Sequence, residues 1–132
     1  MLIELLIGLA SKSGTPAPVP AEEIEWECTN QVEVWCDEEG CSARPDGEFT
    51  PMSITATEDG ALEVCAYTGC WQGGGVMVEQ SSRLLWTASK APFSSSPEQE
   101  GVDLTLLIDR HDGVGFVRAG GIATPLQCNQ SK

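Results

Sequence analysis

The stretch that decides the fold runs from residue 64 to residue 75 and reads VCAYTGCWQGGG. It starts inside an alternating segment, residues 61–68, whose apolar side chains fall on one face: Leu62, Val64 and Ala66. Because side chains alternate between the two faces of a strand, this pattern predicts a strand with one buried face. Asp59-Gly60, just before it, is a strong hairpin signal, since glycine tolerates positive φ. We therefore expect this strand to form the central hairpin of an antiparallel sheet.

Two cysteines enclose a short loop within this stretch. Cys65 and Cys70 are separated by four residues, which is enough for the chain to reverse and for the two sulfur atoms to meet. Trp71 and Gln72 follow directly, and the three glycines after them carry no side chain that could cover the indole. One hypothesis is that the loop presents Tyr67, Trp71 and Gln72 to a partner, because aromatic residues dominate binding hot spots. The alternative is that both rings cap the end of the core, as buried aromatic rings commonly do.

All six cysteines can be assigned to disulfides. Of the fifteen pairings that six cysteines allow, the spacing favours Cys36–Cys41, Cys65–Cys70 and Cys28–Cys128. Structural disulfides persist in oxidising compartments, so the pattern predicts an extracytoplasmic protein, periplasmic or secreted. A four-thiolate zinc site formed by the two local pairs is the competing interpretation, but it gives Cys28 and Cys128 no role. No metal or other cofactor is therefore predicted.

The charge of the chain limits its partners. The 132 residues, enough for one domain, contain 20 acids and 7 bases, which gives a net charge of −13. Nucleic acids and anionic membrane surfaces are poor partners, because binding them requires clusters of lysine and arginine that the sequence lacks. A basic protein would be attracted by such a field. Solubility or a saline habitat explains the same acidity without any partner.

The first twenty residues differ from the rest. Residues 1–10, MLIELLIGLA, are too short for a transmembrane helix but resemble the end of a signal peptide, with Gly8-Leu9-Ala10 as a small-x-small cleavage site. Residues 11–20 are rich in proline and are predicted to be a linker. We therefore place a single disulfide-stabilised β domain at residues 21–128, followed by a polar tail at residues 129–132.

Eight to ten short alternating segments, separated by turn signals, make up residues 21–128. Residues 102–109 are one example, and residues 114–118 are another, with Val114 and Phe116 expected on the apolar face. Residues 90–100, rich in serine and proline, are expected to be an irregular and mobile loop. Regularly spaced short strands are typical of all-β folds. We predict a small antiparallel barrel or strongly curved sheet, with a β-sandwich as the second choice.

No catalytic constellation stands out. The single histidine, His111, lies in a predicted turn between Asp109 and Asp112, and no serine has the G-x-S-x-G context of a nucleophile. Pairs of carboxylates for a hydrolase can be drawn from any of the acids, which makes that hypothesis unspecific. The chain is therefore not expected to be an enzyme.

Two functions of different classes fit these observations. The first is a secreted or periplasmic binding module that engages a basic protein, for example as its inhibitor. In size, acidity and disulfide content the chain is similar to the small barrels that inhibit lysozyme, although it lacks their motifs and no site residue is assigned from them. The second is a non-catalytic structural or accessory subunit of a larger extracytoplasmic assembly. The sequence favours no particular oligomeric state.

Overall fold

A computed structural model describes residues 24–131; the signal-like segment and linker expected at residues 1–20 lie outside the described residues. All regular secondary structure within residues 24–131 is β-strand, so this part of the chain has no helix that could cross a membrane. The eleven strands are β2 (Glu25–Thr29), β3 (Glu33–Asp37), β4 (Gly40–Arg44), β5 (Ser53–Thr57), β6 (Ala61–Ala66), β7 (Gly69–Gly74), β8 (Val76–Gln80), β9 (Arg83–Ala91), β10 (Val102–Asp109), β11 (Val114–Ala119) and β12 (Ile122–Gln130).

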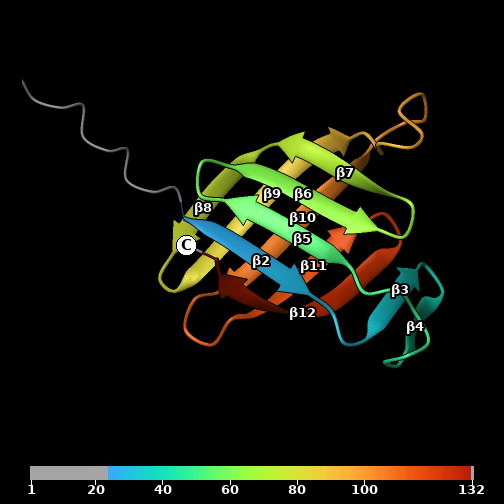
Figure 1. The fold of residues 1–132 in the computed structure, drawn as a ribbon, viewed down its shortest axis with the longest axis horizontal. Helices are drawn as coiled ribbons and strands as arrows, with labels where there is room; N and C mark the ends of the chain where they lie inside the picture. The colour runs from blue at the N-terminus through green and yellow to red at the C-terminus, as the bar shows by residue number, and fades with distance from the viewer. Residues whose placement is uncertain (1–23, 132) are drawn as a thin grey trace, which may run out of the picture.

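The strands form one antiparallel sheet that curls into a nearly closed barrel. Their order is β7-β6-β5-β2-β12-β11-β10-β9-β8, and the β3–β4 hairpin attaches beside β12. Figure 1 shows β7, β6, β5 and β2 as a front layer, with β9, β10 and β11 crossing behind it and the β3–β4 hairpin projecting at one end. The all-β barrel predicted from the sequence is therefore confirmed.

The core fills the space between these two layers. Side chains of β2, β5 and β6 alternate between buried and accessible positions, as do those of β9 to β12. Trp86 of β9 is completely buried, and its indole N–H donates to the Thr57 carbonyl of β5 at 2.7 Å. This bond connects the back layer to the front layer and satisfies a polar group that would otherwise be costly to bury.

One apolar face was assigned wrongly. In β11, Val114 and Phe116 point outward, whereas Val117 and Ala119 are buried. The register has a steric cause at Gly115, which faces inward: a Cβ built there would lie 2.7 Å from the Leu107 carbonyl oxygen and 3.1 Å from Cys128 Sγ. Because a shift of one residue would reverse every side chain, Phe116 is held at the surface.

The barrel closes where β7 meets β9 and the loop that follows β9. Trp71 forms a bridge with Phe93, and the Ser94 amide donates to the Cys70 carbonyl at 2.8 Å. Residues 90–100 were expected to be an irregular loop, but Lys90 and Ala91 belong to β9 and residues 93–96 contribute to this seam. Strand β7 was not expected either, because its glycines show no alternation of side chains.

The three disulfides predicted from the spacing are all present: Cys28–Cys128, Cys36–Cys41 and Cys65–Cys70. Each joins two residues that lie directly opposite each other on paired strands. Both local pairs therefore lack the thiolates that a zinc site would need. Three structural disulfides indicate an oxidising environment. Asn129 and Gln130, assigned to the polar tail, are paired with β2 as part of β12.

Candidate functional site

The structure separates the three residues proposed to bind a partner. Trp71 lies opposite the buried Val64 and packs against the core, with its ring 4.7 Å from the ring of Phe93. Gln72 lies on the outer face, where its amide donates to the Glu63 carboxylate. Tyr67 lies in the turn between β6 and β7, with 50% of its surface exposed. Trp71 is thus partly buried against the core, while Tyr67 and Gln72 face different surroundings.

Tyr67 belongs instead to a cluster centred on Glu33. This glutamate begins β3 and is completely buried. The Tyr67 hydroxyl donates to both of its carboxylate oxygens, at 2.8 and 2.9 Å, and the Trp35 indole N–H donates to Oε1 at 2.7 Å. A buried carboxylate is stable only when such bonds replace its hydration. One carboxylate therefore orients two aromatic side chains that come from different parts of the chain.

The backbone of Tyr67 supports a special role for this residue. Its φ is 58°, in the left-handed region that bulky side chains rarely occupy. Strained positions of this kind persist only when the surroundings hold them, and they occur preferentially at functional sites. The hydrogen bond to Glu33 raises the pKa of the Tyr67 phenol, and the nearby negative charge adds to the effect. The neutral hydroxyl is therefore stabilised as the donor.

Trp35 is fixed in place yet remains accessible. Its indole lies against Gly121, where an added Cβ would lie 3.1 Å from the ring, and the Cys36 amide donates to the Gly121 carbonyl at 2.8 Å. Even so, 41% of Trp35 is exposed. Because the Trp35 ring is already held by its N–H bond to Glu33 and by its contact with Gly121, it loses little conformational entropy when a partner covers it. Trp35 therefore has the properties of a binding anchor.

The hairpin that carries Trp35 is strongly acidic. Residues 33–48 contain six acids and a single base, Arg44. Asp37, Glu38 and Glu39 lie at its exposed tip, next to the Cys36–Cys41 disulfide. A shallow cavity of about 380 Å³ runs along the hairpin, lined by Trp35, Cys36, Asp37, Glu39, Gly40, Cys41, Ser42 and Gly121. An aromatic wall next to carboxylates suits a lysine or arginine side chain.

Sequence reasoning missed Glu33 and Trp35. The sequence separation of 34 positions between Glu33 and Tyr67 hid their contact, and the alternation of residues 31–36 indicated only a strand. A local signal did exist, because Glu33 and Trp35 are two residues apart and so share one face of a strand. An acid and a tryptophan together on the face next to a turn could have been noted as a pair.

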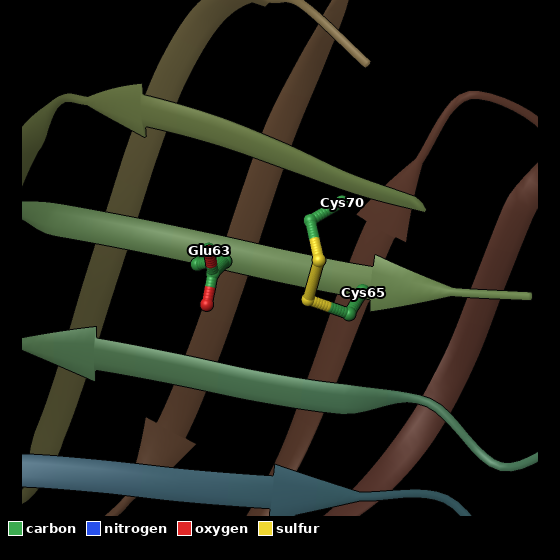
Figure 2. Close-up of side chains that lie close together, drawn as sticks. All are labelled: Glu63, Cys65 and Cys70. Carbon is green, nitrogen blue, oxygen red and sulfur yellow. A yellow bond between two sulfur atoms is a disulfide. The ribbon is translucent and has the colours of Figure 1, made fainter. Parts of the chain in front are cut away.

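A second group of side chains does not form a metal site. Glu63, Cys65 and Cys70 lie close together on the outer face of β6 and β7, and Figure 2 shows Glu63 beside the bonded sulfur atoms. Because the two sulfurs are bonded to each other at 2.04 Å, neither is available as a thiolate ligand.

His111 lies in the exposed turn after β10, where its backbone N–H donates to Asp109 at 2.9 Å.

No family model, curated protein or solved structure matches this chain.

Proposed function

We propose that the chain is a secreted or periplasmic binding module for a basic protein, and that Trp35, Tyr67 and the acidic tip at residues 37–39 form its binding site. The observation that carries this proposal is the Glu33 cluster, in which a buried carboxylate orients two half-exposed rings. Both rings adjoin the acidic hairpin. The three disulfides support an extracytoplasmic location for such a module.

The chemistry of the site favours a cation over other ligands. A lysine or arginine can rest on the face of Trp35 while its charge approaches the carboxylates of the tip, and both interactions are attractive. The disulfide Cys36–Cys41 and the bond from Cys36 to Gly121 hold the hairpin in position before the partner arrives. Such preorganisation reduces the entropy lost on binding.

The first test is binding to lysozyme, used as a compact cationic probe, measured by titration calorimetry with the disulfide-intact protein. We expect binding that weakens as salt is added, because exposed charges are screened over about 8 Å at physiological ionic strength. Trp35→Ala should weaken it at least about tenfold through loss of the aromatic anchor. Tyr67→Phe, which keeps the ring but removes the bond to Glu33, should have a smaller effect.

Phe116→Ala is the matched control. Phe116 is an aromatic residue of similar exposure, 40%, on a different strand of the barrel, so its loss should leave the affinity for lysozyme unchanged. Equal effects of Trp35→Ala and Phe116→Ala, or binding that ignores salt, would contradict the proposed site. If lysozyme does not bind, an oligolysine peptide tests the same chemistry without the demands of a folded surface, and failure of both probes would reject a cationic partner.

A further inference from the structure

The outer face of the back layer carries a row of apolar side chains that no part of the described chain covers. Paired residues on five neighbouring strands form it: Leu85 lies opposite Val78 and Leu107, and Phe116 lies opposite Leu107 and Pro125. Val78, Leu107 and Phe116 are among the most exposed large apolar residues of residues 24–131. A contiguous exposed apolar surface is typical of an interaction site.

Charges flank the apolar row on both sides. On one side, Arg118 lies two residues beyond Phe116 along β11. Within residues 24–131 it forms no ion pair, and its Nε donates to the Gly120 carbonyl at 2.9 Å. On the other side is a shallow hollow of about 260 Å³, lined by Arg83, Leu107, Asp109, Asp112, Val114, Gly115 and Phe116. The hollow thus has apolar walls, which suit the stem of an arginine, and its two carboxylates outnumber its one guanidinium, Arg83, which leaves a net negative charge for the arginine head.

We propose that this face binds a second copy of the chain, in a symmetric dimer whose two-fold axis runs along the apolar row. Rotation about that axis places the Arg118 side of one copy over the hollow of the other. Each Arg118 would then reach the Asp109 and Asp112 carboxylates of its partner, and the row residues would meet their own equivalents. Both copies use the same surface, as closed two-fold dimers require.

The size and charge of the face are compatible with this arrangement. Five strands at about 4.8 Å spacing, each with the next outward-facing residue about 6.8 Å away on either side of the row, give roughly 500 Å² per copy, or about 1,000 Å² in total, at the lower end of specific interfaces. Residues 24–75, which include the strands of the opposite layer, contain eleven acids and one base, whereas residues 76–131 contain six acids and four bases. Most of the repulsion expected from a charge of −13 is therefore kept away from the contact.

Sedimentation velocity of the disulfide-intact protein, from about 1 µM to about 1 mM, tests the proposal across weak to moderate affinities. We expect reversible dimers. Phe116→Glu should raise the dissociation constant at least about thirtyfold, because it places a charge in an apolar contact. Thr55→Glu, which adds the same charge to the opposite layer, should leave it unchanged. Arg118→Ala should weaken the dimer less than Phe116→Glu does.

A cross-link tests the symmetry itself. Residues on the row face their own equivalents in this dimer, so oxidised Leu107→Cys should give a covalent dimer, and Thr55→Cys should not. A chain that stays monomeric throughout the concentration range would overturn the proposal. So would dimers that survive Phe116→Glu, or dimers that Leu107→Cys fails to cross-link. Near-ultraviolet circular dichroism of each variant confirms that the barrel is intact. These outcomes are independent of lysozyme binding, which uses Trp35 and Tyr67.

Discussion

At the scale of single residues, Glu33 differs from a surface acid because its carboxylate orients two aromatic side chains and is not hydrated. Its complete burial means that the carboxylate must be bonded to protein groups, and Tyr67 and Trp35 supply them. Replacing Glu33 would remove the acceptor for the Trp35 N–H and the Tyr67 hydroxyl. Water can reach both donors, since both rings are half-exposed. The expected loss lies mainly in the orientation of the rings and less in overall stability.

Tyr67 gives this bond a direct reporter, because it is the only tyrosine in the chain. Its pKa is raised above the ordinary value of 10.0 by the bond to Glu33. The tyrosinate absorbance should therefore appear at higher pH than in unfolded protein, and Glu33→Gln should move the midpoint back down. A raised pKa stabilises the fold below pH 10, and that contribution is lost as the pH rises through the folded value.

Glu63→Gln is the control for this titration, because Glu63 bonds to Gln72 on the outer face. It should leave the tyrosinate midpoint where it is in the unmodified protein. Tryptophan fluorescence recorded at each pH shows whether the barrel is still folded. An ordinary midpoint in the unmodified protein would mean that the Tyr67–Glu33 bond is not formed in solution.

At the scale of elements, Gly74 and Gly75 differ in the space available for a side chain. Gly75 joins β7 to β8 where the chain passes against β9, and a Cβ there would lie 1.9 Å from the Thr87 carbonyl oxygen. A Cβ on Gly74 would meet nothing within 4 Å. The glycine run, noted in the sequence only because it carries no side chain that could cover the Trp71 indole, thus contains a close backbone approach at the barrel seam.

Gly75→Ala should therefore destabilise the protein by more than about 3 kcal/mol, because backbone atoms must move to admit the methyl group. Gly74→Ala, one residue away, should change the free energy of unfolding by less than about 0.5 kcal/mol. Guanidinium unfolding followed by tryptophan fluorescence measures both. Similar losses for the two variants would show that the seam between β7 and β9 is not as tight as the structure has it.

The elements also show what the sequence could and could not predict. Alternation predicted β6 and β10, because their buried faces carry a period of two. It failed for β7, whose glycines carry no pattern. The Cys65–Cys70 bond held further information: if both cysteines point outward, the next residue, Trp71, must point inward opposite Val64. The Glu33 cluster depends on contacts between distant segments, which periodicity does not encode.

At the scale of the whole molecule, the barrel consists of two parts that meet at two seams. Strands β2, β5, β6 and β7 form one part, and β8 to β12 form the other. One seam is the contact of β7 with β9 and residues 93–96, which ends at Gly75. The other is the pairing of β2 with β12, which the buried Cys28–Cys128 disulfide crosses. That disulfide joins the first described strand to the last, with a sequence separation of 100 residues.

The three disulfides should therefore contribute unequally to stability. In the chain-entropy model, the loop closed by Cys28–Cys128 corresponds to about 4–5 kcal/mol and the short loop closed by Cys36–Cys41 to about 2 kcal/mol. Paired alanine replacement of Cys28 and Cys128 should lower the guanidinium midpoint far more than replacement of Cys36 and Cys41. The latter pair should instead weaken lysozyme binding, because the hairpin that holds Trp35 would lose its cross-link. If both replacements shifted the midpoint equally, the β2–β12 seam would not be the one that holds the two parts together.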